Sequence, residues 1–153
     1  MEVIENTLCT EFLGIDSKKI RHSSYWMYEV IKANFSNSRK DFTPQSTMTT
    51  ALYAQYNLLM YPAPGFHELY EGIRQNFRKV SGSVEPHHIQ AWLNFYYKGD
   101  FIDWHMHWEP EFESWHGFYC VDCEPSKTSY KLDMGKDDII HVESKNDLLV
   151  LGP

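Results

Sequence analysis

Cysteine is scarce in this chain, which has three among 153 residues. So small and odd a number does not build a disulfide framework, and it favours a reducing, cytoplasmic compartment. Long apolar runs are also lacking, since none approaches the roughly 20 residues that span a bilayer. The first residues have no basic stretch followed by an apolar one, which argues against a typical secretory signal. We therefore expect a cytoplasmic protein without a membrane segment.

Positive charge is in short supply as well. The chain has 14 Lys and Arg against 21 Asp and Glu, a net charge of −7. This balance argues against a nucleic-acid-binding surface. The expected partner is instead a small-molecule or peptidyl substrate, and nothing in the sequence indicates an oligomeric state.

The length suits one domain, residues 1–153, and the 16% aromatic content favours a sheet-rich core. Residues 1–85 predict a mixed helical and extended part. A first helix is expected to begin after Ser17, which can cap it, and to end near residue 35. A second helix is expected over residues 66–80, and residues 39–64 are expected to be extended. Residues 86–153 predict short strands at 89–97, 101–108, 115–121, 130–132, 139–142 and 148–151. The pattern favours a mainly β sandwich or barrel with helices outside it.

Residues 102–110 contain the highest concentration of side chains that can bind a metal. On a strand, side chains alternate between faces. One face would then carry Asp103, His105, His107 and Glu109, and the other Trp104, Met106 and Trp108. Imidazoles and carboxylates together are ligands for iron(II), manganese and zinc. The alternative is a solvated polar face on an antiparallel strand.

A longer pattern surrounds these histidines. It combines Trp92 and Asn94, a Lys98-Gly99-Asp100 turn, the Trp104-His105-x-His107 motif and the strand 115–121, and it ends with residues 146–153. This pattern resembles the 2-oxoglutarate/Fe(II)-dependent oxygenases common in cyanophage and marine bacteria. The resemblance implies a double-stranded β-helix, or jelly roll, with Fe(II) and 2-oxoglutarate at one mouth. It further implies a dioxygenase that hydroxylates an unactivated C–H bond, with His105 and His107 as metal ligands.

Further candidate residues come partly from this resemblance and partly from the residues themselves. The family places its distal histidine and a basic residue just after the strand that here ends at Pro153, so we expect a jelly roll that is incomplete at the C-terminus. Candidate third ligands within the chain are Glu109, Asp103 and His141. The candidates for binding 2-oxoglutarate are Asn94, Tyr119 and Lys131, and those for lining the pocket are His116 and Trp104. The tyrosines can equally well fill the barrel.

Two other classes of function stay open. One is a jelly-roll binding or structural module without catalysis, and the other is a cupin-like enzyme with three histidines that does not use 2-oxoglutarate. Cys120 and Cys123 form a lone C-x-x-C. A zinc site usually has a second pair, and on a strand these two side chains would point to opposite faces. We interpret them as buried thiols.

Overall fold

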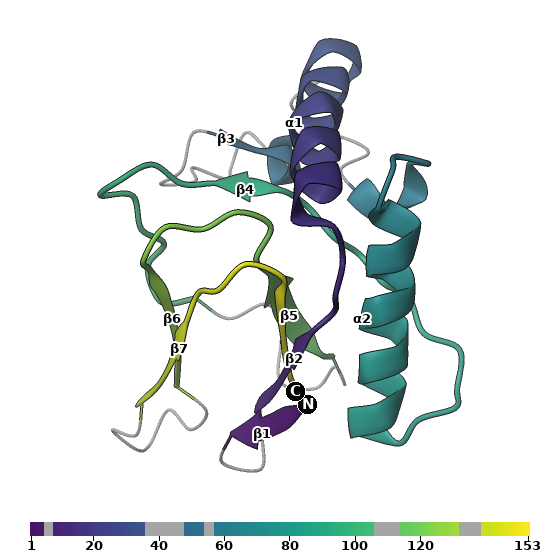
Figure 1. Cartoon of the computed structure of the whole chain (residues 1–153), viewed down its shortest axis with the longest axis vertical. Helices are drawn as coiled ribbons and strands as arrows, with labels where there is room; N and C mark the ends of the chain where they lie inside the picture. The colour runs from purple at the N-terminus through teal and green to yellow at the C-terminus, as the bar shows by residue number, and fades with distance from the viewer. Residues whose placement is uncertain (5–7, 36–47, 54–56, 106–113, 132–138) are drawn as a thin grey trace.

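Four antiparallel strands form the central sheet of the protein, seen here in a computed structural model (Figure 1). The structure describes residues 1–4, 8–35, 48–53, 57–105, 114–131 and 139–153. The strands are β1 (Glu2–Ile4), β2 (Leu8–Phe12), β8 (Leu148–Gly152) and β5 (His116–Tyr119), in the spatial order β1-β2-β8-β5. Cys9 of β2 pairs with Leu151 of β8. The two ends of the chain therefore lie in one sheet.

Two further pairs of strands are antiparallel ribbons: β3 (Met48–Thr49) with β4 (Asn94–Phe95), and β6 (Lys127–Lys131) with β7 (Ile139–Glu143). Along β7 the burial alternates, so that Ile140 and Val142 are buried while their neighbours are exposed. These two side chains join Leu8, Leu148 and Val150 in one apolar cluster. The β6–β7 ribbon therefore covers one face of the central sheet.

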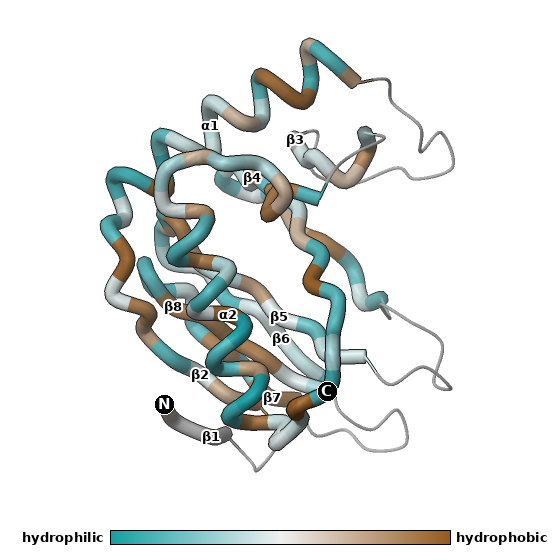
Figure 2. Tube along the Cα trace, turned by 90° about the vertical axis from the view of Figure 1, so that its right-hand side faces the viewer, coloured by the Kyte–Doolittle hydropathy of each residue, from teal (hydrophilic) through white to brown (hydrophobic). Residues whose placement is uncertain are grey.

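Helix α2 (Phe66–Ser81) lies on the opposite side of the sheet from that ribbon (Figures 1 and 2). All five residues of β8 are buried, which fits a strand that is covered on both faces. Its unbroken Leu-Leu-Val-Leu run is the sequence form of such a strand. The sequence prediction of a strand at 148–151 is confirmed.

Helix α1 (Ser17–Asn34) and α2 enclose a second apolar cluster, which includes Ile20, Met27, Ile31, Phe66 and Leu69. Its members recur at helical spacing, so each helix presents an apolar stripe to the other elements.

The start of α1 and the end of α2 follow standard capping chemistry. Asp16 caps α1, since its carboxylate accepts from the backbone N–H groups of Lys18 and Lys19. The prediction that Ser17 is the cap is therefore wrong by one residue. Gly65 and Gly82, which flank α2, both have positive φ, a conformation that glycine adopts without steric cost.

The chain before α2 is less extended than its sequence predicts. Residues 50–52 and 58–60 form short 3₁₀ helices, η1 (Thr50–Leu52) and η2 (Leu58–Met60). The Asn57 side chain accepts from the backbone N–H groups of Leu59 and Ala91 and donates to the Ile89 carbonyl. Side-chain bonds of this kind replace a strand ladder. Of the predicted strand 89–97, only the two residues of β4 form a strand, and Ile89 and Ala91 bond the Asn57 side chain instead.

The mainly β fold with helices in the N-terminal half, predicted from the sequence, is confirmed in its coarse form: antiparallel sheets with two helices in the described residues. The jelly roll stays a prediction. Among the described residues, no helix is both long and apolar enough to cross a membrane.

Candidate metal centre

The segment that carries the histidine motif begins at a tight turn after β4. The backbone N–H of Tyr97 donates to the Asp100 carboxylate at 2.8 Å, and the N–H of Asp100 donates to the Tyr97 carbonyl at 2.9 Å. Gly99 has a φ of 96°, which requires glycine or strain. The predicted Lys98-Gly99-Asp100 turn is therefore confirmed.

Residues 101–105 follow this turn without forming a strand, and all five are exposed. The predicted histidine strand is thus wrong for this part of the segment, and the alternation of faces does not apply to Asp103 and His105. The physical reason is that all five residues are exposed, so they have no buried apolar face that would hold a strand on the core. His107 and Glu109 lie outside the described residues.

His105 has a defined ring orientation. Its Nδ1 lies 2.8 Å from the Asp103 backbone oxygen. A carbonyl oxygen only accepts, so Nδ1 carries the proton and, in the neutral ring, Nε2 carries the lone pair. Histidines that bind metals commonly donate their other ring N–H to a carbonyl or carboxylate in this way. This contact leaves Nε2 as the nitrogen that a metal would bind when the ring is neutral.

The other candidate ligands are spread over several elements. His141 lies on β7, where its Nδ1 is 2.8 Å from the Ser129 hydroxyl of β6. His116 is half-buried at the start of β5 and pairs with Gly152. Among the described residues, the structure brings no three His, Cys, Asp or Glu side chains into one metal-binding group.

The residues predicted to bind 2-oxoglutarate are likewise on different strands. Asn94 of β4 accepts a hydrogen bond of 2.6 Å from the Thr49 hydroxyl of β3. Lys131 is half-buried at the end of β6 and pairs with Ile139. Trp104, predicted to line the pocket, is 61% exposed. It joins Tyr97 and Phe101, which are exposed to a similar degree, in an aromatic segment at the surface.

Tyr119, the third of these residues, is engaged elsewhere. Its hydroxyl donates to the Asp147 carboxylate at 2.9 Å. Burial raises the pKa of Tyr119, and the bond to Asp147 raises it further, so the hydroxyl stays protonated. Because its one proton is already donated, the hydroxyl has none for a bound carboxylate in this arrangement.

Asp147 is the residue that sequence reasoning missed. Besides Tyr119, its carboxylate accepts from the backbone N–H groups of Gly14 at 2.6 Å and Ile15 at 3.1 Å. Its φ of 67° is unusual for a residue other than glycine. An Asn-Asp pair before an apolar run is a turn signal, but that signal carries no information about the distant donors.

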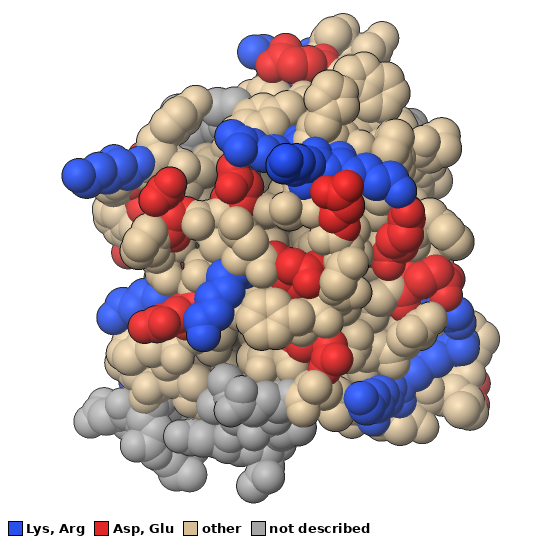
Figure 3. Space-filling view, viewed as in Figure 1, with Lys and Arg blue, Asp and Glu red and all other residues tan. Residues whose placement is uncertain are grey.

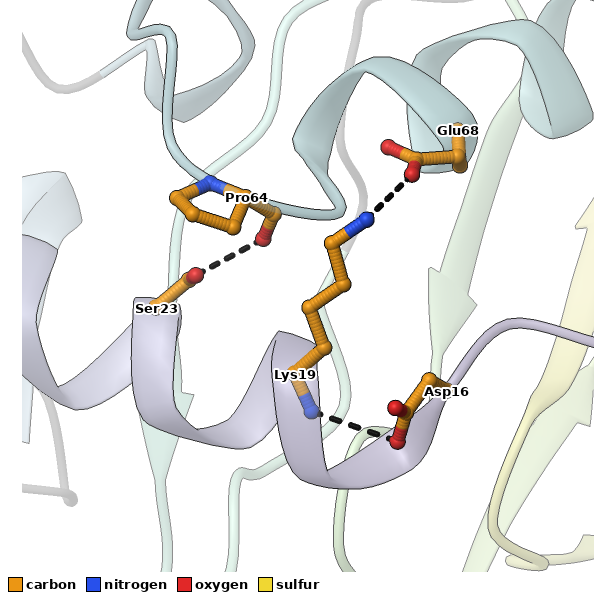
Figure 4. Close-up of polar contacts among 5 residues, drawn as sticks. All are labelled: Asp16, Lys19, Ser23, Pro64 and Glu68. Carbon is orange, nitrogen blue, oxygen red and sulfur yellow. Dashed lines mark hydrogen bonds and ion pairs between the residues drawn. The ribbon is translucent and has the colours of Figure 1, made fainter.

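An open hollow in the described residues lies away from the predicted metal ligands. It has a volume of about 610 Å³ and lies between the start of α1 and the start of α2, where Lys19, Tyr61, His67 and Glu68 line it. Lys19 forms an ion pair with Glu68, and that contact lowers the pKa of the Glu68 carboxyl. Figure 4 shows this pair beside the bond from Ser23 to the Pro64 carbonyl. The hollow includes none of the residues predicted from the motif.

Acidic and basic side chains lie next to one another over much of the face seen in Figure 3. Among the ion pairs, Arg21 and Asp122 lie 3.0 Å apart. Neighbouring charges of opposite sign weaken the field that a polyanion would meet.

Comparisons with known protein families, with curated proteins and with solved structures find no match to this chain. The functional proposal therefore depends on the chain's own residues.

Proposed function

We propose that the chain is a non-haem Fe(II) and 2-oxoglutarate-dependent oxygenase that hydroxylates a small-molecule or peptidyl substrate. The observation that supports it best is the hydrogen bond from His105 Nδ1 to the Asp103 carbonyl. This bond makes Nε2 the ring nitrogen that can bind a metal. His105 lies in a segment that also contains a second histidine, His107, and two carboxylates, Asp103 and Glu109.

The donor set suits iron(II). Two imidazoles, from His105 and His107, and one carboxylate match the ligand set that leaves three positions open for a chelating co-substrate and oxygen. Asp103 and Glu109 are the candidate carboxylates, with His141 as the alternative third ligand. When bound, the metal and 2-oxoglutarate would supply C–H hydroxylation coupled to decarboxylation of 2-oxoglutarate to succinate.

The chain's own residues contribute binding and orientation. The Asp103 carbonyl holds the His105 ring in one tautomer. Asn94 is the candidate for an amide contact to the 2-oxoglutarate carboxylate, and Lys131 is the candidate for its counter-charge. Tyr119 offers no proton to the co-substrate in this arrangement, because its hydroxyl donates to Asp147. The exposed rings of Phe101 and Trp104 provide apolar area for a substrate.

The test is an anaerobic titration of the protein with Fe(II) and 2-oxoglutarate. We expect a visible metal-to-ligand charge-transfer band, which the His105→Ala and His107→Ala variants lose. His87→Ala is the matched control, because His87 Nδ1 also contacts a carbonyl two residues before it, that of Glu85, at 3.2 Å. No band in the unaltered protein would overturn the proposal. Formation of succinate would distinguish it from a cupin-like enzyme with three histidines.

A second candidate is a binding module without catalysis. The exposure of all of residues 101–105 favours it, because iron oxygenase sites work in clefts that exclude water. Under this alternative the exposed rings of Tyr97, Phe101 and Trp104 would contact a partner. Metal analysis of the purified protein separates the two, since the module would contain no stoichiometric iron, manganese or zinc.

A further inference from the structure

The two cysteines of the C-x-x-C sequence come together at the end of β5. The strand ends at Tyr119, and residues 121 and 122 bend the chain back. The side chains of Cys120 and Cys123 then contact one another through a hydrogen bond. The expectation that they point to opposite faces is wrong, because alternation applies within a strand and these residues follow one.

The turn between β7 and β8 holds both cysteines in place. The backbone of Cys120 donates to the Leu148 carbonyl at 2.9 Å and accepts from the Asp147 N–H at 2.8 Å. The side-chain oxygen of Asn146 accepts from the Cys123 backbone N–H at 2.7 Å and from its thiol at 3.1 Å. The pair is therefore fixed to the rest of the fold at both residues.

The two thiols differ in their access to solvent. Cys120 is buried and belongs to the apolar cluster under the β6–β7 ribbon, whereas Cys123 is only half-buried. Cys9 is buried on β2 and is not part of the contact. A reagent in solution therefore reacts first with the Cys123 thiol, and the Cys120 thiol lies next to it.

We propose that Cys120 and Cys123 are a dithiol site that a low-molecular-weight disulfide, such as oxidised glutathione, converts into an intrachain disulfide. Cys123 loses its proton and attacks one glutathione sulfur, which releases the other glutathione as a thiol. Cys120 then loses its proton and attacks the Cys123 sulfur of the mixed disulfide, which releases the second glutathione. The protein loses two electrons and two protons, and the glutathione disulfide is reduced to two thiols.

The surroundings of Cys123 set the rate of this reaction. Burial, together with the neighbouring Cys120, Asp122 and Glu124, raises the pKa of its thiol to about 11. Arg21 is paired with Asp122, and the Asn146 oxygen that holds the thiol is neutral. Below that pKa the thiolate fraction rises about tenfold for each pH unit, and the rate follows it because the thiolate is the nucleophile. We therefore expect slow oxidation at neutral pH and about a tenfold acceleration per unit up to pH 9.

The experiment treats the full chain with oxidised glutathione at pH 7, 8 and 9, stops the reaction with acid and maps the peptides by mass spectrometry. We expect the loss of two hydrogens and a link between Cys120 and Cys123. This readout needs no variant, so it does not depend on whether a substituted chain folds. Glutathione adducts without the internal link, or a link that includes Cys9, would overturn the proposal.

Variants identify the order of attack. Cys120→Ala should trap one glutathione on Cys123, whereas Cys123→Ser should stay unmodified, because the remaining cysteines are buried. Cys9→Ala is the control and should form the link at the rate of the unaltered protein. Equal modification of the Cys120→Ala and Cys123→Ser variants would contradict Cys123 as the first nucleophile.

Discussion

Around the β7–β8 turn, Asp147 joins three separate parts of the chain, whereas the histidine segment at 101–105 is exposed and carries a short-range hydrogen bond. The first region is held by buried strands and by hydrogen bonds between residues more than a hundred positions apart. The second follows the turn at Tyr97–Asp100 and contains the contact between Asp103 and His105. The residues with the most suggestive chemistry are thus not those that hold the fold together.

This difference has a physical basis. A metal ligand needs an available lone pair and access for the metal, and both are lost when the side chain is packed and fully bonded. A residue such as Asp147 stabilises the fold because both of its carboxylate oxygens accept hydrogen bonds. We therefore expect substitutions near β8 to change the free energy of unfolding and substitutions in the histidine segment to change ligand binding.

The largest effect is expected at Gly117 of β5. A Cβ there would collide with the Val150 carbonyl oxygen of β8 and lie 2.7 Å from the Leu151 side chain. Gly117→Ala should therefore lower the free energy of unfolding by about 3 kcal/mol, as severe overpacking does. Urea denaturation measures it.

Gly72 of α2 is the matched control for Gly117. Its added Cβ would meet only the flexible Leu13 side chain, at 2.8 Å. Alanine also favours a helix over glycine by about 1 kcal/mol, which offsets the crowding. If Gly72→Ala proved as destabilising as Gly117→Ala, the contrast between the packed strand and the helix surface would be lost.

The second effect is expected at Asp147. Asp147→Ala removes the acceptor for Gly14, Ile15 and Tyr119 and leaves an alanine at positive φ. We expect a loss of about 2 kcal/mol, typical of hydrogen bonds to a charged group. Asp147→Asn should cost less, because asparagine tolerates this backbone conformation and keeps one acceptor oxygen. Equal denaturation midpoints for the two variants would mean that the carboxylate does not bridge these segments.

Local patterns in the sequence were enough to predict α2, the turn at 97–100 and β8. In each case the signal lies within the element: apolar residues at helical spacing, a Lys-Gly-Asp turn and an unbroken apolar run. The role of Asp147 could not be predicted, because its donors at residues 14, 15 and 119 are near it only after folding. The predicted strand at 101–105 failed for a related reason, since alternation is necessary for a half-buried strand but does not supply a partner strand.

Two tyrosines near β8 give a smaller and more selective contrast. The Tyr119 hydroxyl donates to Asp147, whereas the Tyr130 hydroxyl is buried without a hydrogen-bond partner in the described residues. Tyr119→Phe should cost about 1 kcal/mol, and Tyr130→Phe should be neutral or slightly stabilising. In the Tyr130→Phe variant the aromatic ring at this position still stacks on Phe118. A larger loss for Tyr130→Phe than for Tyr119→Phe would reverse the comparison.

The same two tyrosines predict how stability depends on alkaline pH. Burial raises the pKa of both Tyr119 and Tyr130. The unfolded chain therefore loses these protons first, at about pH 10, while the folded chain keeps them. Because the folded state then binds more protons, the free energy of unfolding is unaffected below that pH and falls as the pH rises above it. Denaturation at pH 9 and pH 11 should show a smaller decrease for either phenylalanine variant than for the unaltered chain.

The smallest effect on stability is expected at His105. The side chain is exposed, and substitutions at such positions usually change the free energy of unfolding by less than about 0.5 kcal/mol. His105→Ala should therefore unfold at the same urea concentration as His87→Ala, within error. Only His105→Ala should lose the charge-transfer band with Fe(II) and 2-oxoglutarate. A large loss of stability without a change in metal binding would instead make His105 part of the framework, like Asp147, and would remove the physical distinction between the two regions.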